Sequence, residues 1–79
     1  MRVKTLKTVV TFATTSDAMA MEATARAHGI PGRIIPVPSQ ISAGCGLAWC
    51  ADSVDRELLV AALVLHGLAH EGVFEVALY

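Results

Sequence analysis

Four side chains that could react or bind a metal ion stand in the second half of the chain: Cys45, Cys50, His66 and His70. Their spacing loosely resembles that of a zinc site with two cysteine and two histidine ligands. Zinc needs all four ligands at about 2.0–2.3 Å. If a helix begins near Asp52, it carries His66 roughly 20 Å away from Cys50, at about 1.5 Å per residue. We therefore expect no metal and no other cofactor, and we expect both histidines to be exposed in turns.

A disulfide between the two cysteines is disfavoured by a similar distance. Along an extended strand, the Cα atoms of Cys45 and Cys50 would be about 16 Å apart, which is beyond the reach of a disulfide. Cys50 falls in a predicted strand, and we interpret it as a small packing residue. A thiol redox sensor would need a resolving cysteine nearby, and Cys50 is badly placed for that role.

Cys45 has a different setting, because it lies between Gly44 and Gly46 in a stretch without a hydrophobic pattern. Glycines give the backbone unusual freedom and leave space around the sulfur. Two interpretations remain open on these residues alone. The cysteine either fills a gap in the packing, or it presents a reactive thiolate in an open loop.

Hydrophobic patterns and turn residues predict the elements that position Cys45. Alternating apolar residues indicate strands, and runs rich in Ala, Met and Leu between capping residues indicate helices. The predicted order is strand 6–12, helix 17–28, strand 33–35, loop 37–46, strand 47–51, a helix between Asp52 and Gly67, and strand 73–78. This order favours a single α+β domain over residues 1–79. The expected fold is a ferredoxin-like βαββαβ sandwich, with a four-stranded antiparallel sheet and two helices on one face.

Capping residues predict where the helices begin and end. Residues 14–16 offer hydroxyls to the start of the first helix, and Gly29 ends it. Asp52 is the predicted cap of the second helix, with Asp55 reaching back towards its amide.

Apolar residues also mark faces of the predicted elements. One set recurs at helical spacing in the second helix: Val54, Leu58, Ala61, Ala62 and Leu65. Another set is expected on the outer face of the sheet: Val9, Thr11, Val73 and Ala77. An apolar sheet face is better covered than exposed to water, so we expect a homodimer.

The predicted topology brings three segments to one end of the sheet: residues 14–17, loop 37–46 and residues 66–71. His28 and Asp52 belong to the opposite end. Cys45 would then lie near the start of the first helix, whose free amides carry partial positive charge and favour a thiolate. Hydroxyls and imidazoles at this end are candidate donors or proton acceptors for the thiol: Thr15, Ser16, Ser42, His66 and His70.

The composition excludes several classes of protein. With 54% hydrophobic and 16% charged residues, the 79-residue chain is not intrinsically disordered. A net charge of −1 argues against nucleic-acid binding, although Arg2, Lys4 and Lys7 cluster near the start. The longest apolar run, Leu58–Leu65, is too short for a membrane span. The beginning of the chain resembles a signal peptide, but its apolar stretch is half threonine. We therefore expect a soluble cytoplasmic protein that binds neither membranes nor nucleic acid.

Several motifs carry a resemblance to a known family. They are Gly29–Pro31, Ile35–Pro38 and above all Ile41–Ala48, preceded in the first helix by Thr15, Asp17, Ala18 and Glu22. Together they cover nearly the whole chain and resemble the selenium/sulfur carrier protein-like family. These are small bacterial proteins, formerly described as a domain of unknown function.

The resemblance implies that Cys45 is a carrier cysteine, which holds sulfane sulfur or reduced selenium and is flanked in its loop by Ser42, Gly44 and Gly46. It also implies sulfur or selenium donor and acceptor proteins as partners, and a carrier rather than a turnover enzyme. Such proteins commonly have a basic residue after the second proline, where this chain has Ser39. The alternative is a non-catalytic ferredoxin-like binding or oligomerisation module in which Cys45 is incidental.

Overall fold

Four strands of this computed structural model form one antiparallel sheet, in the order β2-β3-β1-β4. The structure describes residues 3–79, so Arg2 of the basic cluster lies outside the described residues. The elements are β1 (Thr5–Thr11), α1 (Thr15–His28), β2 (Arg33–Pro36), β3 (Leu47–Asp52), the 3-10 turn η1 (Ser53–Asp55), α2 (Arg56–Leu65) and β4 (Gly72–Leu78). The predicted ferredoxin-like α+β arrangement is confirmed.

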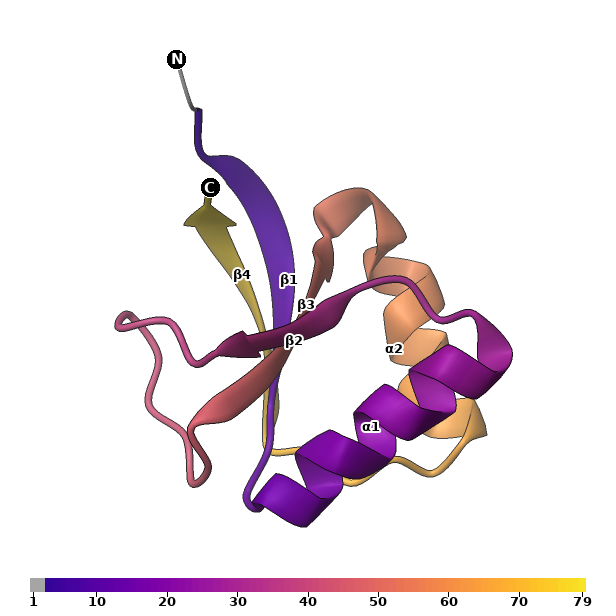
Figure 1. Cartoon of the computed structure of the whole chain (residues 1–79). Coiled ribbons are helices and arrows are strands. Elements are labelled where there is room, and N and C mark those ends of the chain that lie inside the picture. Colours follow the sequence, from indigo (N-terminus) through magenta and orange to yellow (C-terminus); the bar gives the residue numbers. More distant parts are fainter. Residues whose placement is uncertain (1–2) are drawn as a thin grey trace.

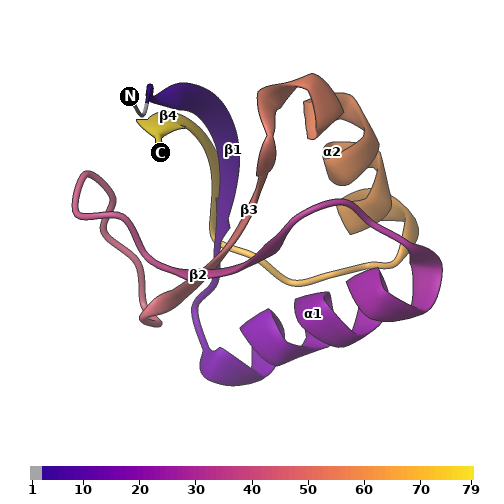
Figure 2. The same ribbon diagram turned by 45° about the horizontal axis from the view of Figure 1, so that its top comes forward.

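Both helices cover one face of the sheet, and the loop over residues 37–46 extends on the other side (Figure 1, Figure 2). The main core lies between the sheet and the helices and includes Val10, Phe12, Met21, Trp49, Leu59 and Leu63. A smaller cluster lies on the outer face and consists of Val9, Ala48 and Cys50, with Ile35, Val37 and Ile41 packed against it. The loop therefore covers part of the outer face.

Helix α1 begins and ends at residues that suit those positions. Thr14 is the N-cap, and its side-chain oxygen accepts a hydrogen bond from the Asp17 amide at 3.1 Å. Gly29 ends the helix in the left-handed region, with φ of 69°. Only small or flexible side chains of α1 face the core, namely Ala18, Met21 and Ala25. The helix thus lies close to the sheet and begins two residues earlier than predicted.

The predicted cap of the second helix is wrong. Asp52 makes no capping hydrogen bond, because its carboxylate forms an ion pair with Lys7 on the neighbouring strand. The chain instead passes through η1 before α2 begins at Arg56. Helix α2 ends at a glycine as predicted, since Gly67 has φ of 60° and the Leu68 amide bonds back to the Leu63 carbonyl at 2.9 Å.

Helix α2 has two apolar faces, of which one is buried. The buried face consists of Leu59, Ala62 and Leu63. Four of the five residues that the sequence pattern singled out lie on the exposed side of η1 and α2: Val54, Leu58, Ala61 and Leu65. Among the described residues, no helix is both long and apolar enough to cross a membrane.

The two faces of β4 are exchanged relative to the prediction, which placed Val73 and Ala77 on the outer face of the sheet. Val73 pairs with Val10 in the register and packs against the main core, whereas Phe74 pairs with Val9 on the outer face. The outer face therefore shows Phe74, Val76 and Leu78 in place of Val73 and Ala77. A polar contact accompanies this register. The Thr8 hydroxyl, on the helix side, donates a hydrogen bond to Glu75 at 2.7 Å.

Candidate functional site

The loop over residues 37–46 is fastened to the fold at several points. At its base, the Val37 amide donates to the Gly46 carbonyl at 3.0 Å. The Cys45 amide donates to the carbonyl of Phe12, just after β1, at 3.1 Å. The Gly44 amide donates to the Glu71 carboxylate at 2.9 Å. The position of Cys45 is thus set by the ends of two neighbouring strands, β1 and β4.

The Cys45 sulfur lies inside the loop base and not in open solvent. The residue is 9% exposed and belongs to the main core cluster. The Leu47 amide donates a hydrogen bond to Sγ at 3.2 Å, and the thiol is 3.4 Å from the Leu47 carbonyl, to which it donates. In this conformation the burial of Cys45 agrees with a cysteine that fills a gap in the packing, the first of the two interpretations left open by the sequence.

The two glycines beside Cys45 have different roles. Neither has a positive φ, so the expected need for backbone freedom is not what selects them. A Cβ on Gly44 would lie 2.8 Å from the carbonyl oxygen and 3.2 Å from the Cα of Ala13. A Cβ on Gly46 would meet nothing within 4 Å. Gly44 therefore permits close approach of two backbone segments, and Gly46 leaves open space.

The predicted hydroxyl donors lie near the loop but do not bond the sulfur. Thr15, Ser16 and Ser42 are exposed, and the structure gives none of them a hydrogen bond to Cys45. Two amides at the start of α1 are already occupied, because Asp17 bonds the Thr14 side chain and Ala18 bonds the Thr14 carbonyl at 3.3 Å. The amide that bonds the sulfur comes from Leu47, at the start of β3.

His66 lies away from Cys45. Its ring is 4.4 Å from the ring of His28, which closes the last turn of α1. Cys45 bonds Phe12 before the first turn of α1, and a helix of that length spans about 20 Å. The prediction that His28 belongs to the opposite end from His66 is therefore wrong, since the two helices end side by side.

His70 lies closer to the loop, in the turn before β4. Its exposed ring contacts the Leu68 carbonyl at 2.8 Å through Nδ1, and the next residue, Glu71, holds Gly44. The expectation that residues 66–71 and the loop share a surface is confirmed at Glu71. The sequence reasoning did not single out Glu71. An acidic side chain just before the last strand, at the end where the loop was expected, was the available signal.

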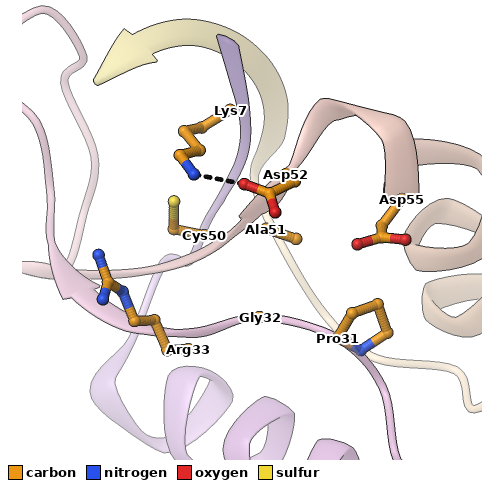
Figure 3. A pocket seen from close by; sticks show the side chains of 8 residues that line it. All are labelled: Lys7, Pro31, Gly32, Arg33, Cys50, Ala51, Asp52 and Asp55. Carbon is orange, nitrogen blue, oxygen red and sulfur yellow. Dashed lines mark hydrogen bonds and ion pairs between the residues drawn. The ribbon is translucent and has the colours of Figure 1, made fainter. Parts of the chain in front are cut away.

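Cys50 lies in a separate pocket on the outer face (Figure 3). The pocket has a volume of about 340 Å³ and is lined by Lys7, Pro31, Gly32, Arg33, Cys50, Ala51, Asp52 and Asp55. Burial raises the pKa of the Cys50 thiol, and Asp52 adds to that effect, while the positive charges of Lys7 and Arg33 lower it in part. Cys50 therefore remains a thiol at neutral pH.

The two cysteines are free and lie on opposite faces of the sheet. Within residues 3–79, no group of three or more His, Cys, Asp or Glu side chains is arranged to hold a metal ion. The features at Cys45 are those of a thiol held by backbone groups in a fastened loop.

Comparison with known proteins gave one match. No curated protein and no solved structure matches the chain. A protein-family model described as "Putative Se/S carrier protein-like" matches residues 7–75, which include every element from β1 to the middle of β4 and the whole Cys45 loop. The chain therefore belongs to this family.

Proposed function

We propose that the protein carries sulfur or selenium on Cys45 between a donor protein and an acceptor protein. The observation that carries the proposal is the match to the Se/S carrier family over residues 7–75, which include Cys45 and its fastened loop. The form that attacks in such an exchange is the thiolate. A carrier needs one such sulfur and a docking surface, and it needs no deep catalytic pocket.

The transfer is a thiol–persulfide exchange. The Cys45 thiolate attacks the terminal sulfur of a donor persulfide, the sulfur–sulfur bond of the donor breaks, and the donor leaves as a thiolate. Cys45 then holds a persulfide. An acceptor thiolate attacks its terminal sulfur and releases Cys45 as a thiolate again. A donor that carries a selenium atom on its sulfur loads Cys45 by the same exchange, without added oxidant or reductant.

The burial of Cys45 adds a step to this cycle. At 9% exposure, the sulfur does not reach a donor in the closed loop. Two hydrogen bonds, from Gly44 to Glu71 and from Cys45 to Phe12, hold the loop closed. Both lie at the end of the sheet, where a docking protein reaches them. We infer that the loop opens when a donor or acceptor protein binds.

A second candidate is the non-catalytic binding or oligomerisation module. One observation favours it, because a cysteine packed in the main core also fits a purely structural role.

The two functions are separated by a loading experiment. The protein is incubated with a cysteine desulfurase and cysteine, and its intact mass is measured without reductant. The carrier predicts an added mass of one sulfur in the wild type and in Cys50→Ser, and no added mass in Cys45→Ser. Circular dichroism checks that both variants are folded. A parallel incubation with selenocysteine and a selenocysteine lyase compares selenium with sulfur. No adduct from either donor, or an adduct that remains on Cys45→Ser, would favour the structural module.

A further inference from the structure

Helix α2 presents an apolar stripe to solvent. Leu58 is 59% exposed and Leu65 is 78% exposed, and Val54 in the preceding turn η1 is 87% exposed. Ala61 lies between the two leucines and is also exposed. The steps along this stripe are four, three and four residues, which places all the members on one side of a helix. The stripe carries no charged side chain.

A groove runs beside the stripe. It has a volume of about 720 Å³ and is lined on one side by α2 and on the other by the residues that end α1. Leu58, Ala61 and Leu65 form its apolar wall, and His28, Ile30 and His66 lie along it. A groove with an apolar wall next to protruding leucines can both receive and supply an apolar side chain. That is the requirement for a self-complementary interface.

We propose that this face binds the same face of a second copy of the chain, with the two α2 helices antiparallel about a two-fold axis near Ala61. When the axis lies midway between Leu58 and Leu65, Leu58 of one copy lies opposite Leu65 of the other copy. The small side chain of Ala61 at the centre lets the two helices approach closely. The two helix dipoles also oppose one another in this arrangement, which is favourable.

The polar groups at the two ends of α2 complement one another in the antiparallel arrangement, because carboxylates accept hydrogen bonds and an imidazole N–H donates one. Its start carries two acids, Asp55 and Glu57, and its end carries the stacked pair His66 and His28. About the same axis, Glu57 of one copy faces His66 of the other. Arg56 is already paired with Glu75 at 2.8 Å, so its side chain does not occupy the carboxylates of Asp55 and Glu57. A parallel arrangement would instead bring acid against acid and histidine against histidine.

The proposed interface leaves the loop over residues 37–46 accessible. Cys45 bonds Phe12, which precedes the start of α1, whereas the interface lies at the end of α1, next to His28. The outer face of the sheet is partly covered by the chain itself, through Val37 and Ile41. The α2 face also carries the more exposed apolar side chains, since Leu58 and Leu65 are 59% and 78% exposed and Phe74 on the outer face is 41% exposed. The inference does not rest on the proposed carrier function, and either can fail alone.

Sedimentation equilibrium tests the association. The wild type is expected at twice its 8.3 kDa mass at tens of micromolar. Leu58→Glu and Leu65→Glu each weaken the dimer by more than about tenfold in Kd, because each buries a charge at the centre of the interface. Val3→Glu is the control, because Val3 is 72% exposed but lies before β1, away from the stripe. A monomeric wild type overturns the proposal. So does a dimer that Leu58→Glu leaves intact, or a monomer that gains mass only with a sulfur-donor protein.

Engineered cysteines and charges test the orientation. Ala61→Cys is expected to form a disulfide-linked dimer, because its two copies meet near the axis. Val54→Cys is not, because its two copies lie about 20 Å apart along the antiparallel helices. The wild type, whose own cysteines are buried, is the control. Glu57→Lys and His66→Glu should each weaken the dimer, and the double variant should restore it. Equal crosslinking at both cysteine positions, or no restoration, overturns the antiparallel arrangement.

Discussion

The carboxylate of Glu71 accepts a hydrogen bond from the Gly44 amide at 2.9 Å and so joins the residue before β4 to the residue before Cys45. The Glu71 amide in turn donates to the Thr11 carbonyl at 2.7 Å, at the end of β1. One residue thus fixes the loop through its side chain and is itself fixed through its backbone. This makes Glu71 the residue that positions the loop over residues 37–46, which holds Cys45.

Replacing Glu71 tests this role. Glu71→Ala removes the acceptor for Gly44, so the loop opens more often and Cys45 reacts several-fold faster with iodoacetamide. The free energy of unfolding falls by about 1 kcal/mol, as expected for one hydrogen bond. The labelling rate is read by mass spectrometry of the Cys45 peptide.

Two variants serve as comparisons for Glu71→Ala. Glu71→Gln keeps an acceptor oxygen and should label at close to the wild-type rate. Glu22→Ala removes an exposed carboxylate of α1 that lies 4.0 Å from Arg26, and it should have no effect on labelling. If all three variants label like the wild type, Glu71 does not hold the loop.

The glycines on either side of Cys45 should differ in their tolerance of a methyl group. Gly44→Ala places a Cβ 2.8 Å from the backbone oxygen of Ala13, which cannot rotate away, and should cost roughly 1–3 kcal/mol of stability. Gly46→Ala meets nothing within 4 Å and should change stability by less than about 0.5 kcal/mol. Urea denaturation of both variants measures the difference. Equal stability of the two would show that the loop does not lie against Ala13.

Cys50 should make stability depend on pH in the alkaline range. Burial raises the pKa of its thiol in the folded state, so the unfolded chain releases the proton first, near pH 8.5. The contribution of the Cys50 thiol to the free energy of unfolding is therefore complete below that pH. It is lost as the pH rises through the folded-state pKa of the thiol. Denaturation midpoints above about pH 8 should fall more steeply for the wild type than for Cys50→Ala. Parallel pH profiles of the two proteins would show that the folded and unfolded thiols titrate alike.

The order of strands and helices could be predicted because each element carries its own local signal. Alternating residues mark β1 and β4, and Gly29 and Gly67 mark the ends of the helices. The direction of β4 could not be predicted, because alternation defines two faces and does not say which one meets the helices. A contact between distant residues accompanies that choice, as the Thr8 hydroxyl meets Glu75 across the sheet.

The same limit applies to α2 and to the candidate site. The exposed stripe of α2 is as apolar as its buried face, so periodicity alone could not tell Leu58 from Leu59. Cys45 could be singled out by its glycine neighbours and by the family motifs. Its burial could not be predicted, because it depends on hydrogen bonds to Phe12 and Leu47 that no local pattern encodes.

The start of α1 offers a last test, on two neighbouring threonines. The Thr14 side chain accepts the Asp17 amide at 3.1 Å, so Thr14→Ala leaves that amide without its cap and should lower the free energy of unfolding by about 1 kcal/mol. Thr15→Ala changes an exposed residue in the first turn, where alanine is the better helix former, and should be neutral or slightly stabilising. Urea denaturation of both variants gives the ranking. A larger loss for Thr15→Ala would show that Thr15 is the N-cap in place of Thr14. The helix would then begin one residue further from the loop that holds Cys45.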